Sequence, residues 1–288
     1  MAVAALTMVY RDTWALSRWY AHHARQFGAR NLFVVAHGED PEIARICPEA
    51  SIITIPRDDL AHFDRRRAQM LDGFHAGLSK AYDWVVRTDA DELICVDPAL
   101  WRDVPQALAA QDGPVVTALG FDVVELPGDA PMHDAPVLSQ RRNIAFSGHY
   151  SKAVAANRAV AFHLHGVRVA PRKLENYPFN MPRGLFLAHL KYANRAVLQA
   201  GSAQREAIAN GSAPGLPGSG WADATGDAAR FLTDFEAKPE VTWQKAERRA
   251  YEALSQNPSR NAKASVVKTH ALKMKMRCLL PDRFAEQG

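Results

Sequence analysis

The sequence predicts an α/β protein with a doubly wound, mostly parallel central sheet that is flanked by helices and followed by a helical C-terminal extension. Two observations predict this class. Short apolar runs rich in β-branched residues recur through the first half, and stretches with apolar residues at helical spacing separate them. Of the 288 residues, 48% are hydrophobic and 23% are charged, which is the composition of a globular protein with a sizeable core.

The elements of the first half follow one another in a regular order. Strands are predicted over residues 3–10, 31–36, 51–55 and 83–88. A helix that is capped by Asp12 or Thr13 and ends at Gly28 separates the first two strands. Apolar residues from Phe63 to Leu78 recur at helical spacing and predict a second long helix before the fourth strand.

The second half is less regular. Strands are predicted over residues 115–126 and 151–160. His163 and His165 alternate along a further predicted strand, so only one of them can face a site. Residues 210–220 (NGSAPGLPGSG) predict a flexible loop, which is a candidate lid over a binding site.

Charge and cysteine content limit the classes of protein. The net charge of +4 at pH 7 gives no reason to expect a nucleic-acid partner. Three widely spaced cysteines argue against a disulfide framework and against a cysteine-built zinc site. No run approaches the roughly 20 apolar residues of a membrane-spanning helix. The N-terminal MAVAALTMVYRD lacks the basic region and cleavage site of a signal peptide, so we expect a cytoplasmic protein.

Polar clusters follow three of the predicted strands, at Arg11-Asp12, at residues 37–40 (HGED) and at residues 89–92 (DADE). Ligands of open α/β sheets bind at the carboxyl ends of the strands, so we expect these clusters to lie together. Two carboxylates with one spacer residue can share a divalent cation and leave positions for substrate phosphates. The third cluster therefore predicts a site for a nucleotide diphosphate, with a solvated acidic turn as the alternative.

The segments MVYRDTWALSRWYAHHARQFGARNLFVV, DWVVRTDADELI and LFLAHLKY make residues 3–200 similar to bacterial glycosyltransferases related to family 2, which have the GT-A fold. The resemblance implies that Asp91 binds Mn²⁺ or Mg²⁺ and that Asp89 contacts the ribose or a metal-bound water. It also implies that Asp12 contacts the nucleoside, for which a helix N-cap is the alternative. His189 matches a late histidine that ligates the metal or contacts a phosphate in many such enzymes.

Further residues complete the predicted site. His165 is a second candidate metal ligand. A guanidinium binds phosphate through two parallel hydrogen bonds, so Arg66 or Arg67 is a candidate for the diphosphate, with a solvated helix face as the alternative. Lys152 is a further basic candidate. The residues predicted to bind the nucleotide or donor are Arg11, Asp12, His37, Arg66, Arg67, Asp89 and Lys191.

An inverting transfer needs a carboxylate base that takes the proton from the acceptor hydroxyl. In the enzymes that this chain resembles, the base typically lies downstream of the paired aspartates. Glu175 is the only acid between Asp134 and Glu206 and is therefore the first candidate, although a surface glutamate is the alternative at this position. Asp122 and Glu125 are the other candidate bases.

We therefore expect a metal-dependent glycosyltransferase that moves a sugar from a nucleotide-diphosphate donor to a hydroxyl of a glycan or lipid-linked acceptor, in glycan or polysaccharide synthesis. Residues 1–205 are expected to form the nucleotide-sugar- and metal-binding catalytic domain. Residues 206–288 are expected to form a loop and a helical basic extension packed on the same domain. The alternatives are a non-catalytic module that binds sugar or protein and, with less support, a phosphohydrolase or nucleotidyltransferase.

The stretch after Pro258 holds seven Lys and Arg residues against Asp282 and Glu286. This charge predicts peripheral contact with an anionic membrane surface at the inner face of the membrane. An ordinary solvated helix over residues 268–280 is the alternative.

Overall fold

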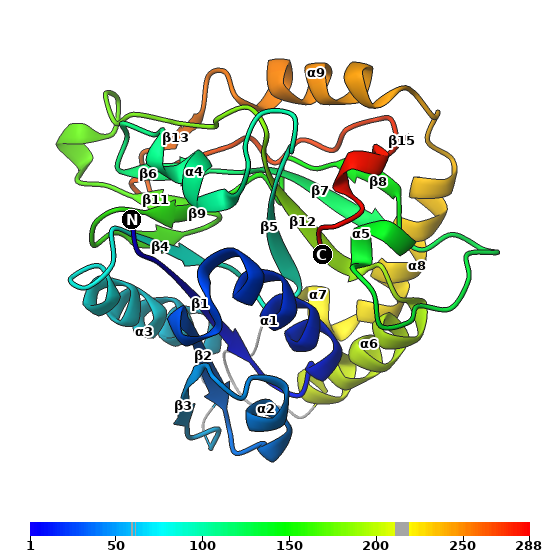
Figure 1. Cartoon of the computed structure of the whole chain (residues 1–288), viewed down its shortest axis with the longest axis horizontal. Helices are drawn as coiled ribbons and strands as arrows, with labels where there is room; N and C mark the ends of the chain where they lie inside the picture. The colour runs from blue at the N-terminus through cyan, green and yellow to red at the C-terminus, as the bar shows by residue number, and fades with distance from the viewer. Residues whose placement is uncertain (59, 61, 211–218) are drawn as a thin grey trace.

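A computed structural model describes residues 1–58, 60, 62–210 and 219–288. These residues form three sheets and the helices that cover them (Figure 1). The loop predicted over residues 210–220 lies, over residues 211–218, outside the described residues.

The first sheet has six strands in the order β3-β2-β1-β4-β9-β6. The strands β1 to β4 run parallel, and β9 runs antiparallel to both of its neighbours. The predicted α/β class with a mostly parallel sheet is therefore confirmed. The bounds of these strands are Val3–Val9 (β1), Leu32–His37 (β2), Ser51–Ile55 (β3), Trp84–Arg87 (β4), Val115–Thr117 (β6) and Ala153–Ala156 (β9).

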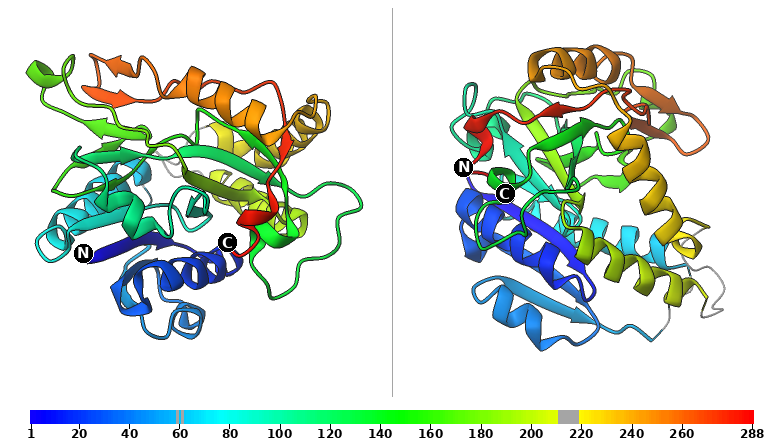
Figure 2. Two further views of the ribbon diagram at one scale, coloured as in Figure 1. Left: turned by 45° about the horizontal axis from the view of Figure 1, so that its top comes forward. Right: turned by 90° about the vertical axis from the view of Figure 1, so that its right-hand side faces the viewer.

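Helices α1 (Thr13–Phe27) and α3 (Phe63–Leu78) pack on opposite faces of this sheet (Figures 1 and 2). Successive side chains of a strand point to opposite faces. Accordingly, Val3 and Ala5 of β1 lie in one core cluster with residues of α1, and Leu6 of β1 lies in another cluster with residues of α3. The alternation of side chains along β1 thus lets this one strand contribute to the cores under both helix layers.

The second sheet has five strands in the order β15-β8-β7-β12-β5. The strand β12 pairs antiparallel with β5 and parallel with β7. Because β5 follows β4 after a short loop, the chain passes from the first sheet into the second at that loop. The bounds are Glu92–Val96 (β5), Leu119–Val124 (β7), Asn143–Phe146 (β8), Leu185–Tyr192 (β12) and Cys278–Leu279 (β15).

The third sheet has the order β10-β11-β14-β13, and its strands pair antiparallel. His163 and His165 do not share a strand, so the predicted alternation is wrong. The strand β10 ends at His163, and Leu164 and His165 both have positive φ in the tight turn before β11. The bounds are Ala161–His163 (β10), Gly166–Arg168 (β11), Ser259–Asn261 (β13) and Val266–Lys268 (β14).

The C-terminal part is helical as far as α9, which packs on the second sheet along the top of the view in Figure 1. The solvated helix considered for residues 268–280 is wrong, because β14 pairs with β11 and β15 pairs with β8. The remaining helices are α2 (Pro41–Ile46), α4 (Val104–Ala109), α5 (Val137–Gln140), α6 (Arg195–Ala209), α7 (Ser219–Ala222), α8 (Ala224–Glu236) and α9 (Trp243–Leu254). Single turns of 3-10 helix are η1 (Ala29–Asn31), η2 (Pro171–Lys173) and η3 (Asp282–Phe284).

None of the described helices combines the length and the apolar character that crossing a membrane would require.

Candidate functional site

The loop between β4 and β5 is held by both sheets. The backbone N–H of Thr88 donates to Leu6 in the first sheet, and the Trp19 indole N–H donates to the Thr88 hydroxyl over 2.8 Å. On the other side, the backbone N–H of Leu190 donates to the carbonyl of Asp91 over 2.8 Å. Asp89 and Asp91, which follow the buried strand β4, thus lie at the junction of two sheets. Hydrogen bonds to both sheets hold the backbone of this loop.

The Asp89 carboxylate is bound by two cations. Arg67 of α3 donates to one of its oxygens, and Lys152 Nζ lies 3.2 Å from the other. Lys152 also lies 2.7 Å from Glu92 Oε2, and the same Glu92 oxygen accepts a hydrogen bond from the backbone N–H of Asp89. We call Arg67, Asp89, Glu92 and Lys152 the lysine cluster.

The charges of the lysine cluster balance one another. Burial by itself raises the pKa of Asp89, but the charges of Lys152 and Arg67 outweigh it and hold that pKa well below its usual range. Burial raises the pKa of Glu92, which the charge of Lys152 opposes. Asp89 is thus ionised and already paired within the protein.

The Asp91 carboxylate faces a histidine instead. His189 Nε2 lies 3.4 Å from Asp91 Oδ2, and His189 Nδ1 donates to Asp122 Oδ1 over 2.7 Å. The register of the second sheet explains the grouping, because His189 of β12 is paired with Glu92 of β5 on one side and with Asp122 of β7 on the other. The Tyr150 ring stacks on the imidazole at a centroid distance of 3.5 Å. We call Asp91, Asp122, Tyr150 and His189 the histidine cluster.

The two carboxylates change the acid–base properties of the imidazole. Burial lowers the pKa of His189, but the hydrogen bonds with Asp122 and Asp91 outweigh burial and raise the pKa to about 9. A protonated imidazole between two carboxylates can lose its proton and bind a metal cation instead, because the two carboxylates favour positive charge at that position.

Asp91 and His189 fit a divalent cation. A carboxylate on the second nitrogen of an imidazole is the usual support of a metal-binding histidine, and Asp122 takes that position. Two atoms that are each about 2.1 Å from one ion lie roughly 3 to 3.4 Å apart, as Asp91 Oδ2 and His189 Nε2 do. Within the described part of the chain, no group of three or more His, Cys, Asp or Glu residues is arranged to hold a metal. A cation held by Asp91 and His189 would therefore need further ligands from water or from a bound molecule.

Two further predicted residues lie near Asp91. Asp12 caps α1 by accepting a hydrogen bond from the backbone N–H of Ala15, and burial together with the charge of Asp91 raises the pKa of Asp12. Burial and the charge of Arg205 lower the pKa of Lys191. Arg205 of α6 also acts on Asp12 and Asp91, and the sequence interpretation missed it because nothing local links α6 to β4.

An aromatic and basic group lies at the carboxyl ends of β1 and β2. The Arg57 guanidinium contacts His37 Nδ1 over 2.7 Å and lies 3.4 Å from the Tyr10 ring centroid. Phe63 stacks on the His37 ring at 5.1 Å. The predicted Arg11, in the left-handed backbone region, lies 5.3 Å from the Tyr10 ring centroid. Of this group, only Arg11 and His37 were recognised from the sequence.

Three further predicted residues lie outside the two clusters and outside the groups beside them. Arg66 is exposed on α3, whereas the neighbouring Arg67 reaches Asp89. His165 sits in the turn after β10 with its Nδ1 at the His149 carbonyl, and burial with the charge of Lys152 lowers its pKa to about 4. Glu175 is exposed on the segment after η2.

No protein-family model matches the sequence, and no curated protein matches it. Among solved structures, the chain is similar to S. aureus TarS 1-349, at 12% identity and a TM-score of 0.35 over 82% of this chain and 72% of that one. It is also similar to mannose-1-phosphate geranyltransferase from Thermus thermophilus, at 14% identity and a TM-score of 0.29 over 99% of this chain and 77% of that one.

A cytidylyltransferase from Leptospira borgpetersenii is similar at 18% identity and a TM-score of 0.26, over 41% of this chain and 54% of that one. The chain thus spans about half the length of that protein.

Proposed function

We propose that this protein is a metal-dependent glycosyltransferase that moves a sugar from a nucleotide-diphosphate donor to an acceptor hydroxyl. The observation that supports this proposal best is the histidine cluster. It combines a carboxylate at the carboxyl end of a parallel strand with an imidazole 3.4 Å away that a second carboxylate supports.

Asp91 and His189 would hold Mn²⁺ or Mg²⁺, which when bound neutralises the charge of the departing diphosphate. Asp122 orients His189 by accepting the hydrogen bond from Nδ1. Arg205 and Lys191 place positive charge near Asp91, where the diphosphate of the donor would lie. The nucleoside would lie toward Asp12 and the aromatic group at the ends of β1 and β2.

The lysine cluster would keep Asp89 in one position. Both oxygens of Asp89 already have a cationic partner, so a ribose hydroxyl that binds there would meet an oriented carboxylate. This arrangement favours the role of a substrate contact for Asp89 over that of a direct metal ligand.

The base for the acceptor proton stays a proposal with three candidates, of which Glu125 already accepts a hydrogen bond from the backbone N–H of Arg195. Asp122 already accepts a hydrogen bond from His189, and Glu175 is exposed on another segment. A Glu175→Gln variant with lower kcat and unchanged metal-dependent donor binding would identify Glu175. A parallel loss of metal affinity and kcat in Asp122→Asn would assign Asp122 to the support of His189 instead.

The acceptor, a glycan or lipid-linked hydroxyl compound, is also a proposal, as is peripheral contact with the cytoplasmic face of a membrane. Exposed Leu272, Lys273 and Lys275 lie together in the chain before β15 and favour such contact. Sedimentation with liposomes at low salt tests it, and equal binding to neutral and anionic vesicles would argue against it.

Thermal unfolding with UDP-, GDP-, CMP- and dTDP-sugars, with and without Mn²⁺, tests the main proposal. Binding at about 100 times the dissociation constant adds roughly 2.7 kcal/mol of stability. We expect a metal-dependent shift with one donor that is lost in Asp91→Ala and kept in Asp112→Ala, which removes an exposed carboxylate from the loop before β6. The proposal would be contradicted if none of the donors shifted the unfolding temperature, or if the Asp91→Ala variant kept the shift.

A further inference from the structure

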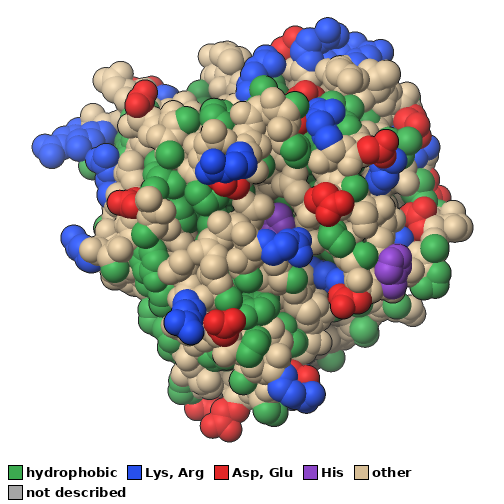
Figure 3. Space-filling model, in the orientation of Figure 1, with side chains coloured by type: hydrophobic (Ala, Val, Ile, Leu, Met, Phe, Trp, Pro, Cys, Tyr) green, Lys and Arg blue, Asp and Glu red, His purple; other side chains and the backbone are tan. Residues whose placement is uncertain are grey.

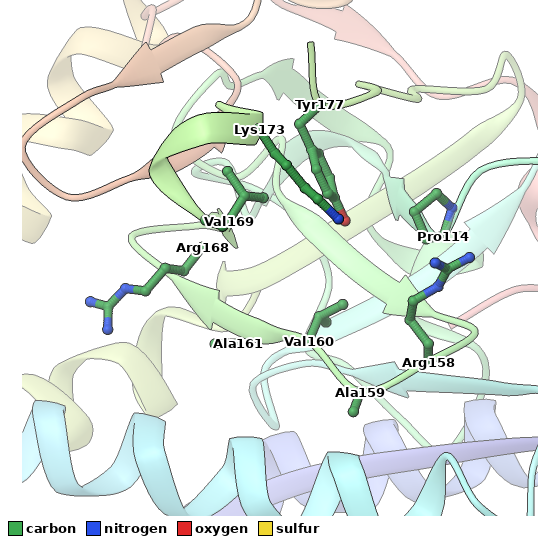
Figure 4. A pocket seen from close by; sticks show the side chains of 10 residues that line it. Pro114, Arg158, Ala159, Val160, Ala161, Arg168, Val169, Lys173 and Tyr177 are labelled. Atoms are coloured by element: carbon green, nitrogen blue, oxygen red, sulfur yellow. The ribbon is translucent and has the colours of Figure 1, made fainter. Parts of the chain in front are cut away.

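A basic pocket of about 460 Å³ lies at the far end of the β10–β11 hairpin from the turn at His165 (Figure 4). The chain between β9 and β10 supplies Arg158 and Val160, and the chain from the end of β11 through η2 supplies Arg168 and Lys173. A second hollow of about 420 Å³ adjoins it, shares Arg158 and Lys173, and adds Arg172. Neither hollow contains a residue of the histidine cluster or the lysine cluster.

The charge of this pocket is uncompensated. The four cationic side chains that line the two hollows, Arg158, Arg168, Arg172 and Lys173, are exposed, and no Asp or Glu of the described residues lines either hollow. Among the described residues, none of the four takes part in an ion pair. On the face drawn in Figure 3, Lys and Arg side chains also project from the left edge, where the segment after β11 protrudes in Figure 1. An anion that enters the pocket would therefore meet cations that no carboxylate already binds.

The floor of the pocket is apolar and fixed. Val169 is buried in a small core cluster, and Val160 and Tyr177 pack against the same cluster. The backbone carbonyl of Tyr177 accepts a hydrogen bond of 3.0 Å from Arg260, which ties this segment to β13. An aromatic ring beside aliphatic side chains, with cations at the rim, suits a sugar ring that carries a negative charge.

The strands β9 and β11 connect the pocket to the candidate active site. Lys152 directly precedes β9 and Arg158 follows it, so the six residue-to-residue steps from one to the other span at most about 20 Å at 3.3 Å per step. His165, on whose pKa Lys152 acts, is three residues from Arg168, or about 10 Å along β11. A group bound in the pocket therefore lies up to about 20 Å from Lys152 along the chain, which suits a further unit of an extended acceptor.

We propose that this pocket binds a carboxylate or phosphate group of the acceptor, carried on a unit other than the one that presents the reacting hydroxyl. The assignment to the acceptor rests on the proposed glycosyl transfer, whereas the anion site itself does not. Cations without acidic partners bind the charge, and Tyr177 with Val160 contacts the apolar face of the ring that carries it.

Calorimetric titration of the whole chain tests the proposal with three probes: an oligogalacturonate, a neutral oligosaccharide of the same length, and inorganic phosphate. The test variant is Arg158→Ala/Lys173→Ala. The matched control is Lys245→Ala/Arg249→Ala, which removes two exposed cations from α9. We expect an anionic probe to bind more tightly than the neutral one, and about tenfold more weakly to the test variant, because two exposed charge interactions are lost.

The oligogalacturonate and phosphate arms distinguish a carboxylate ligand from a phosphate ligand. Equal binding of all three probes, no binding of either anion, or an equal loss in the control variant would overturn the proposal. The donor-induced thermal shift with Mn²⁺ is measured on the same variants and should not change. If the anion binds and the donor shift is absent, the anion site stands and the proposed glycosyl transfer fails.

Discussion

Asp89 and Asp91 follow the same strand with one residue between them, but their carboxylates have different partners. Asp89 is held by Arg67 and Lys152, whose charges cannot be removed near neutral pH. Asp91 faces His189, a cationic group that can give up its proton and then bind a metal. The two carboxylates of one acidic motif therefore have different surroundings, because their partners come from residues far away in the sequence.

The largest effect is expected from the histidine cluster. Asp91→Asn keeps the size of the side chain but removes its charge, and we expect transfer activity to fall by at least about 100-fold. Steady-state kinetics at saturating Mn²⁺ measures this, with Asp112→Asn as the control. A fall of less than tenfold would mean that the two aspartates do not differ in the way proposed.

In the lysine cluster we expect the main effect on stability. Lys152→Ala leaves Glu92, which is only 1% exposed, without its cation and should destabilise the fold by about 3–5 kcal/mol. Arg67→Ala should cost only about 1 kcal/mol, because both Arg67 and Asp89 are partly exposed. Urea unfolding measures both variants.

The double variant Lys152→Met/Glu92→Leu is the control for the stability effect. Replacing a buried ion pair with apolar side chains is often nearly neutral, so this variant should recover much of the lost stability. If it is no more stable than Lys152→Ala, the loss of stability in Lys152→Ala does not come from the unpaired charge of Glu92.

Asp122→Asn weakens the support of His189 without removing a proposed ligand. We expect the affinity for Mn²⁺, measured by calorimetry in the presence of donor, to fall between about tenfold and 100-fold. Asp129→Asn, in the loop after β7, is the control. Unchanged affinity in Asp122→Asn would remove Asp122 from the metal site.

Asp97 supplies a reference carboxylate outside both clusters. Its oxygens accept hydrogen bonds of 2.7 Å each from Arg283, and these, together with the N–H of Ala99, lower the pKa of Asp97 although burial raises it. The contribution of this pair is therefore present above the unfolded-state pKa of about 3.9 and is lost as pH falls through the lower folded-state value.

Asp97→Asn should cost on the order of 1 kcal/mol at neutral pH and less in acid. Urea unfolding between neutral pH and about pH 3 measures the difference from the unaltered chain. An equal loss of stability at neutral pH and in acid would show that the charge of Asp97 does not contribute to stability. Donor binding should not change, which separates a structural ion pair from those of the site.

Local patterns predicted most elements in the first half of the fold, but not α2, β5 or α4. The strands at residues 3–10, 31–36 and 83–88 are predictable because a buried strand needs a continuous apolar run, and Asp12 is recognisable as an N-cap from its neighbours alone. The basic segment after Pro258 was less predictable, because β14 and β15 are strands only through pairing with distant partners.

By itself the sequence determined that a pair of aspartates follows a buried strand, because the acidic residues come directly after the apolar run in the chain. Only the tertiary structure decided that Lys152 meets Asp89, that Asp122 supports His189, and that His165 lies in a turn. Each of these contacts depends on sheet register or on a turn that joins strands. Register is fixed by packing between segments that lie 60 or more residues apart, such as Asp122 and His189, so the spacing of residues along the chain contains no information about it.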